Sequence, residues 1–357
     1  MRGTNVARPA RLLVAVIACT AVLPARAQVV PKLLVAVAGV PMTASPSTAT
    51  TAVAHCGSGT PLIGGGMLAA RANPADPRPH SPAFRGKGSY PSDANGVPVA
   101  DAAVDPAAWS ATANFGMESE VGDQITSLAL CTTRTFDQRV LVSGSVNAPI
   151  PSGTVGRVTV TCPPGTVVVG GGAQATPPGS PGLKPVGMYP SDAAGNMLPD
   201  GAANATSWTA VASTATGGFG NTTTAYAVCA TAVGLATRMA RVDVPGPTAA
   251  RTTTTATVGC GTDSLIGGGV LADRSVGTLH QGVHLRGSYP SDLSGVPAVA
   301  GTADPAAWSA VVSSGGLGSP LTQTHVFALC VVEPVPPVAV QDSGVQRRSS
   351  RRAMPRR

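Results

Sequence analysis

A tetrapeptide that could do chemistry, Tyr-Pro-Ser-Asp, occurs three times in this chain, each time with a Gly three residues after the Asp. A tyrosine ring beside a carboxylate could stack on a sugar and bond its hydroxyls, or the carboxylate could hold calcium. Calcium needs about six or more oxygen ligands, and only one carboxylate recurs here. The candidate ligand-binding residues are Tyr90 and Asp93, Tyr189 and Asp192, and Tyr289 and Asp292.

The same tetrapeptide is also typical of a structural turn. Asp favours the first position of a turn, and Gly favours the left-handed position at its end. Proline restricts the preceding tyrosine to extended backbone, which makes that tyrosine the end of a strand entering the turn. We therefore expect the tyrosine rings to fold back over their own repeat, with sugar binding as the alternative.

No other residues form a catalytic or metal-binding constellation in the sequence. The five histidines share no position in the repeat, and we expect them to be incidental surface residues. His280 and His284 have the spacing of a zinc pair on a helix, but Gly282 and the strand-like Val283 argue against a helix. The sequence predicts no catalytic residue, no metal and no cofactor. The histidines are His55, His80, His280, His284 and His325.

Six of the seven cysteines fall as one pair per repeat. Because each pair brackets one repeat, we predict disulfides between Cys56 and Cys131, Cys162 and Cys229, and Cys260 and Cys330. Such bonds persist in oxidising compartments, so the protein is expected to be secreted, extracellular or periplasmic.

The N-terminus provides a route to that compartment. Residues 1–27 read as a signal peptide, with a basic start, an apolar segment from Leu12 to Ala18 that is too short to span a bilayer, and a small-residue cleavage site ending at Ala27. The mature chain then has no transmembrane segment. In the alternative, the residues before Cys19 form a lipoprotein signal and Cys19 carries a lipid anchor.

The polar tetrapeptide belongs to a longer repeat. Each copy opens with a cysteine and a triple glycine and continues to one tryptophan that lies 19 residues after the tyrosine. Glycine inside a strand marks a place where a backbone or a large ring packs close, so we expect each tryptophan to be buried over its own triple glycine. These structural residues are Gly64, Gly65, Gly66 and Trp109; Gly170, Gly171, Gly172 and Trp208; Gly267, Gly268, Gly269 and Trp308.

Alternating apolar residues before each opening cysteine predict strands. An Asp or Asn stands four residues before each tryptophan and is followed by Pro or Ala (Asp105, Asn204, Asp304). This pattern predicts a helix N-cap and one short helical turn before the tryptophan. The predicted segments are a signal peptide (1–27), a linker (28–45), repeat 1 (46–135), a linker (136–153), repeat 2 (154–232), a linker (233–250), repeat 3 (251–333) and a Pro- and Arg-rich disordered tail (334–357).

The net charge of +7 does not indicate a nucleic-acid binder. Residues 1–42 hold five basic residues and no acid, and the tail holds six arginines against Asp342, which leaves thirteen basic and sixteen acidic residues in 43–340. A nucleic-acid binder concentrates positive charge on a folded face. The mildly acidic folded region therefore excludes nucleic acid as the expected partner.

The full motif set resembles a module found in secreted proteins of high-GC bacteria. It reads Cys-Pro-x-Gly, a triple glycine, Ser-Tyr-Pro-Ser-Asp, Trp and Tyr-Ala-x-Cys-Ala, and repeat 2 matches it best through Cys162, Tyr189, Trp208 and Tyr226. Repeats 1 and 3 depart from it at the proline after the cysteine and at the last tyrosine. The resemblance implies a secreted β module and brings no activity or ligand.

Together these patterns predict an all-β protein of three tandem, disulfide-linked sandwich or jelly-roll-like repeats, arranged in a row or as a pseudo-trimer. The first functional hypothesis is a non-enzymatic cell-surface or matrix protein whose repeats act as spacer or adhesive. The alternatives are a multivalent glycan-binding protein, with cell-wall polysaccharide as its partner, and an extracellular hydrolase. The sequence leaves the oligomeric state open.

Overall fold

The computed structural model confirms the all-β prediction. It describes residues 33–42, 45, 47–71, 84–115, 123–148, 154–180, 182–214, 220–231, 234–274, 282–315 and 321–332, which form eighteen strands and no helix. In this part of the chain no helix is long and apolar enough to cross a membrane. The predicted signal peptide, Cys19 and the predicted tail lie outside the described residues.

Each repeat consists of six strands. Those of repeat 1 are β1 (Leu33–Pro41), β2 (Ala49–His55), β3 (Leu62–Arg71), β4 (Phe84–Ser92), β5 (Ala108–Phe115) and β6 (Asp123–Thr132). Those of repeat 2 are β7 (Gln138–Asn147), β8 (Val155–Thr161), β9 (Val167–Thr176), β10 (Leu183–Ser191), β11 (Ser207–Thr214) and β12 (Thr222–Thr231). Those of repeat 3 are β13 (Thr237–Pro245), β14 (Thr253–Gly259), β15 (Ser264–Arg274), β16 (Val283–Ser291), β17 (Ala307–Ser314) and β18 (Thr322–Val331).

The three predicted linkers each contain a strand, so the linker prediction is wrong at β1, β7 and β13. These strands pair along their whole length with the last strand of their own repeat, β6, β12 and β18. Each of these strands contains two or three valines but none of the repeated signature residues. Each repeat therefore begins well before its first cysteine.

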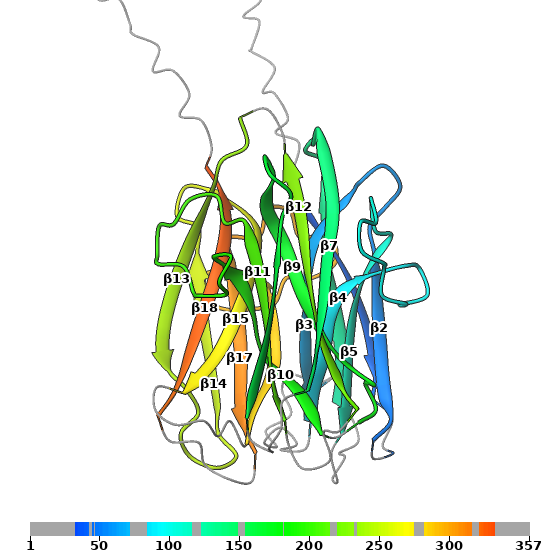
Figure 1. Cartoon of the computed structure of the whole chain (residues 1–357), viewed down its shortest axis with the longest axis vertical. Helices are drawn as coiled ribbons and strands as arrows, with labels where there is room; N and C mark the ends of the chain where they lie inside the picture. Colours follow the sequence, from blue (N-terminus) through cyan, green and yellow to red (C-terminus); the bar gives the residue numbers. More distant parts are fainter. Residues whose placement is uncertain are drawn as a thin grey trace, which may run out of the picture. The chain divides into compact units, whose positions relative to one another are not determined.

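Neighbouring repeats share their sheets. The strand orders are β1-β6-β3-β16-β17-β14, β2-β5-β4-β9-β12-β7 and β13-β18-β15-β10-β11-β8, so each six-stranded sheet takes three strands from one repeat and three from another. Figure 1 shows the strands running alongside one another, with β10 next to β15 although they belong to different repeats. This cyclic sharing gives the pseudo-trimer arrangement.

The three disulfides form as predicted. Cys56 bonds Cys131, Cys162 bonds Cys229 and Cys260 bonds Cys330, with Cα–Cα distances of 5.5 to 5.6 Å. Each bond joins the two halves of one repeat, because the first cysteine follows the second strand of the repeat and the other lies on its last strand. No bond crosses between repeats among these six cysteines.

The three tryptophans are also buried as predicted, each over the middle glycine of its own repeat. A Cβ at Gly171 would overlap the Trp208 ring, and Gly65 and Gly268 meet Trp109 and Trp308 in the same way. All three indoles are completely enclosed, and they belong to one hydrophobic cluster that extends through all three repeats.

The outer two glycines of each triplet contact other repeats. A Cβ at Gly170, the first glycine of repeat 2, would overlap the carbonyl oxygen of Ile63 and lie 2.9 Å from the Cα of Gly64 in repeat 1. The last glycine approaches the tyrosine backbone of another repeat, and a Cβ at Gly269 would lie 2.9 Å from the Cα of Tyr189. At Gly170, Gly267 and the last glycine of each triplet the backbones thus meet where no side chain fits, whereas a Cβ at Gly64 would make an ordinary contact, 3.5 Å from the Cα of Gly170.

The predicted helical turn before each tryptophan is absent. Asp105, Asn204 and Asp304 adopt left-handed φ values of 52°, 52° and 43°, which Asn and Asp tolerate and which end a helix instead of starting one. Asn204 accepts a hydrogen bond from the backbone N–H of Thr237 (2.9 Å), and Asp304 does the same for Leu33 (2.8 Å). The side chain therefore caps the first strand of the next repeat, not a helix.

Replacing Gly171 by Ala should destabilise the fold, because the new Cβ overlaps the buried Trp208 ring. We expect a loss of about 3 kcal/mol in the free energy of unfolding, at the upper end of the range for overpacking. The matched control is Gly57→Ala, at an exposed glycine whose Cβ would meet only the Thr60 hydroxyl at 3.6 Å. Denaturant unfolding measures both, and equal stability of the two variants would contradict the packing described here.

Candidate functional site

The repeated tyrosines are not available as sugar-stacking surfaces. Tyr90, Tyr189 and Tyr289 are 2%, 0% and 3% exposed. The Tyr189 hydroxyl donates a hydrogen bond to the carbonyl of Gly195 (2.9 Å), and the other two reach Gly96 and Gly295 at 3.3 Å. Each ring therefore folds back beneath its own turn, as the extended backbone before proline predicts.

The repeated aspartates hold those turns closed. Asp192 accepts hydrogen bonds from the backbone N–H groups of Ala194 (2.9 Å) and Asn196 (2.8 Å), and Asp93 and Asp292 make the equivalent pairs. The pKa of Asp192 lies below its usual range, because the Asn196 side chain and these N–H groups favour the carboxylate. The glycine at the end of the turn has the expected left-handed backbone, with φ 82° at Gly195.

Side chains from neighbouring strands complete the tyrosine environments. The Tyr189 ring stacks on Phe327, with ring centroids 5.5 Å apart, and the Tyr90 ring lies 6.1 Å from Tyr226. Burial raises the pKa of Tyr289 to about 12. The tyrosine and aspartate positions thus act as parts of the fold in all three repeats.

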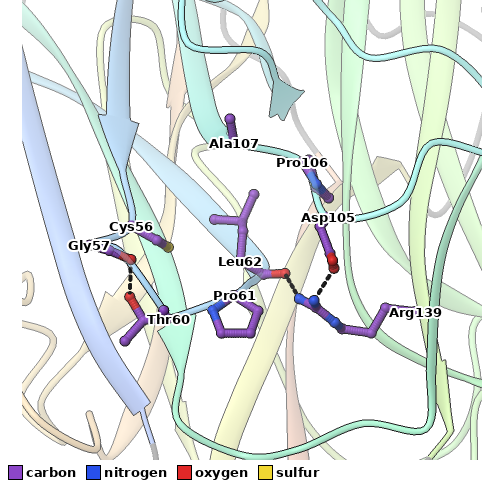
Figure 2. A pocket seen from close by; sticks show the side chains of 10 residues that line it. Cys56, Gly57, Thr60, Pro61, Leu62, Asp105, Pro106, Ala107 and Arg139 are labelled. Atoms are coloured by element: carbon purple, nitrogen blue, oxygen red, sulfur yellow. Dashed lines mark hydrogen bonds and ion pairs between the residues drawn. The ribbon is translucent and has the colours of Figure 1, made fainter.

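One open hollow lies between repeats 1 and 2. It has a volume of about 420 Å³ and is shown in Figure 2. Asp105, Pro106 and Ala107 line one side, and the loop after Cys56 lines the other. Arg139 reaches between them, pairs with the Asp105 carboxylate and donates to the Leu62 carbonyl at 3.4 Å.

This hollow breaks the threefold equivalence of the repeats. Arg139 pairs with Ala230, the residue that follows Cys229 on the last strand of repeat 2. In repeats 1 and 3 the residues at the position of Arg139 are Leu33 and Thr237. Asp105 therefore pairs with an arginine side chain where its counterparts cap a backbone N–H. The hollow offers one carboxylate and one guanidinium, already paired, to a small polar molecule. Sequence reasoning missed Arg139 because it lay in a predicted linker.

A second feature that the sequence did not reveal is a buried group of basic side chains, which we call the basic cluster. It consists of the half-buried Arg85 and the buried Lys87 on β4, Lys184 on β10, and His284 and Arg286 on β16. Burial, and after it the positive charge of the neighbouring Arg85, lowers the pKa of Lys87 and of Lys184 to about 7. Burial, then the nearby Lys184, lowers the pKa of His284.

Two of the histidines correct the expectation of surface residues. His284 is buried in the basic cluster, and His325 is buried with its Nδ1 2.8 Å from an Asp243 carboxylate oxygen. His55 is exposed as expected, and His80 and His280 lie outside the described residues. Within the described ranges, no group of three or more His, Cys, Asp or Glu could hold a metal ion.

No protein-family model matches this chain, and a comparison with curated proteins finds no match either.

The basic cluster should make stability depend on pH. The pKa values of Lys87 and Lys184 are about 7 in the folded protein, against 10.5 for an ordinary lysine, so between these values the unfolded chain binds more protons. The free energy of unfolding should then rise from pH 7 to pH 9. This interval lies below the pH at which tyrosine ionisation begins to affect stability. Below about pH 7 both states are protonated, and the full cost of the buried charge is present.

Denaturant unfolding at pH 7 and pH 9 measures this effect. The matched variant is Lys184→Met, which keeps a similar chain length without the titratable group and should show a smaller rise. A stability that is flat or falls over this interval in the parent protein would contradict the buried, neutral lysines.

Proposed function

We propose that this protein is a non-enzymatic, secreted or cell-surface repeat protein that serves as a spacer and adhesive. The observation that carries this proposal is the use of the repeated polar residues. In all three repeats the tyrosine is buried and the aspartate bonds its own turn. The residues that recur are therefore accounted for by the fold, as structural signatures are, whereas a catalytic site is usually unique.

Secretion is supported by two features. Three disulfides are common in proteins of oxidising compartments, and the first 27 residues have the composition of a signal peptide. The lipid anchor at Cys19 is the alternative mode of attachment.

The adhesive role is supported by exposed apolar side chains on the turn that follows the third Tyr-Pro-Ser-Asp. Leu293, Val296 and Val299 are 70%, 59% and 68% exposed, and they lie within seven residues of one another. In repeat 2 the corresponding segment carries the polar residues Asn196 and Asp200, so it lacks this apolar group. Exposed apolar groups gathered on one surface are typical of protein contact sites.

The glycan-binding alternative needs a different surface. The buried tyrosines argue against stacking, but the carboxylates of Asp93, Asp192 and Asp292 remain near the surface and could still bond sugar hydroxyls. Replacing all three aspartates by Asn removes the charge and keeps an oxygen that can accept the turn hydrogen bonds. Stability should change little, so any loss of binding reports on the ligand.

Retention of the mature protein on isolated cell-wall material separates the two functions. We expect the triple variant Leu293→Ser, Val296→Ser, Val299→Ser to be retained about tenfold less tightly, the equivalent of roughly 1.4 kcal/mol. The triple Asp→Asn variant should be retained like the parent. If the Asp→Asn variant alone loses retention, the glycan function replaces ours, and if the parent is not retained at all, the adhesive role is wrong.

A further inference from the structure

The hollow between repeats 1 and 2 reaches one of the three disulfides. Cys56 is among its lining residues, and Figure 2 shows the Cys56 sulfur within this group. Cys56 is half-buried, whereas its counterparts Cys162 and Cys260 are 6% and 2% exposed. The partner cysteines on the last strand of each repeat are all buried, at 3% exposure or less. A small molecule in the hollow therefore meets a disulfide through its Cys56 end.

The backbone beside Cys56 explains why this disulfide is open. In repeat 2 the N–H of Cys162 donates to the carbonyl of Thr206 (2.8 Å), and repeat 3 has the same bond. In the described part of the chain no such bond joins Cys56 to Ala107, the equivalent residue of repeat 1. Ala107 lines the hollow instead. The pairing of β2 with β5 thus ends one residue earlier than in the other repeats, and the Cys56 sulfur is left uncovered.

The walls of the hollow also carry a positive group. The Arg139 guanidinium lines the hollow together with Cys56, and its charge is offset by the paired Asp105 carboxylate. The side chain of Asp105 is 58% exposed and that of Arg139 is 14% exposed, so solvent screens the carboxylate more than the guanidinium. The species that attacks a disulfide is a thiolate, and a nearby arginine favours that form of a thiol.

We propose that Cys56 is a site of thiol–disulfide exchange, at which a small thiol becomes covalently attached to the protein. The thiolate enters the hollow and attacks the Cys56 sulfur, because this is the accessible sulfur of the bond. A new sulfur–sulfur bond forms to Cys56, the Cys56–Cys131 bond breaks, and its electron pair leaves on Cys131, whose sulfur takes a proton from solvent. One disulfide replaces another, so the thiol is the only co-reactant. This site is independent of the adhesive function.

The exchange releases a link between two sheets. Cys56 follows β2, an edge strand of the sheet β2-β5-β4-β9-β12-β7, and Cys131 lies on β6 in the sheet that begins with β1. Their bond therefore joins two sheets near the point where β1 leads into β2. The disulfides of repeats 2 and 3 are buried and keep their own links. Attachment of a thiol thus loosens one corner of the pseudo-trimer and leaves the other two closed.

Reaction of the folded protein with reduced glutathione tests the site. The protein is incubated with excess glutathione at pH 8 without denaturant, quenched with acid, alkylated and mapped by mass spectrometry of its peptides. At early times we expect glutathione on Cys56 and a free thiol at Cys131, formed at least about tenfold faster than any product of the two buried disulfides, because access limits the rate of exchange. In denaturant the three disulfides should react at similar rates.

Asp105→Asn tests the contribution of charge. This variant keeps the shape of the side chain and leaves the Arg139 guanidinium without its opposite charge. Glutathione should then react with Cys56 about threefold faster at low ionic strength, and 1 M sodium chloride should remove most of that gain.

Asp263→Asn is the matched control in repeat 3. Asp263 pairs with Arg238 at 2.8 Å and lies three residues after the buried Cys260. The variant therefore leaves an unopposed arginine close to a disulfide whose two cysteines are both buried. The bond from Cys260 should stay as slow as in the parent, because charge does not replace access.

Three results would overturn the proposal. Equal rates for the three disulfides without denaturant would mean that the exchange proceeds through global unfolding. Glutathione on Cys131 instead of Cys56 would mean that the thiol does not enter through the hollow. No adduct at any time, with the Cys56–Cys131 bond either intact or fully reduced, would mean that the protein does not hold a thiol there.

Discussion

The fold depends on the close approach of backbone chains at the triple glycines. The first glycine of each triplet meets the corresponding segment of another repeat, the middle glycine lies under the tryptophan of its own repeat, and the last meets a tyrosine backbone on the strand of another repeat. The triple glycine thus determines both the packing of the tryptophan inside a repeat and the contacts of that repeat with the other two. At every one of these glycines except Gly64, a side chain would separate either the indole from its sheet or one repeat from the next.

The same cyclic arrangement explains why the polar signatures are structural and where charge accumulates. The tyrosine strands β4, β10 and β16 join the glycine strands β9, β15 and β3 of neighbouring repeats through only two residue pairs each. Beyond these pairs the tyrosine strands contact one another, and there Arg85, Lys184 and His284 converge. A position that is ordinary in one repeat becomes a place where basic side chains converge when three repeats assemble.

The sequence was sufficient for features that lie within one repeat. The cysteine pairs, the tryptophan over its glycine and the Tyr-Pro-Ser-Asp turn depend on residue types that recur in the same order in every repeat, and the structure confirms them. Strands β1, β7 and β13 were missed because they lack signature residues, although they pair within their own repeat. Features that depend on contacts between repeats were also missed, such as the left-handed backbone of Asp105 and its counterparts, which serve the next repeat. The basic cluster uses Arg, Lys and His at one position, which hides the equivalence.

The central claim is that the three repeats form one interdependent body, since every sheet is shared. Differential scanning calorimetry of the mature protein tests this claim most directly. The account predicts one transition whose calorimetric and van't Hoff enthalpies agree, as for a single cooperative unit. Separate transitions, or a calorimetric enthalpy about three times the van't Hoff value, would show that the repeats unfold independently and would contradict the account.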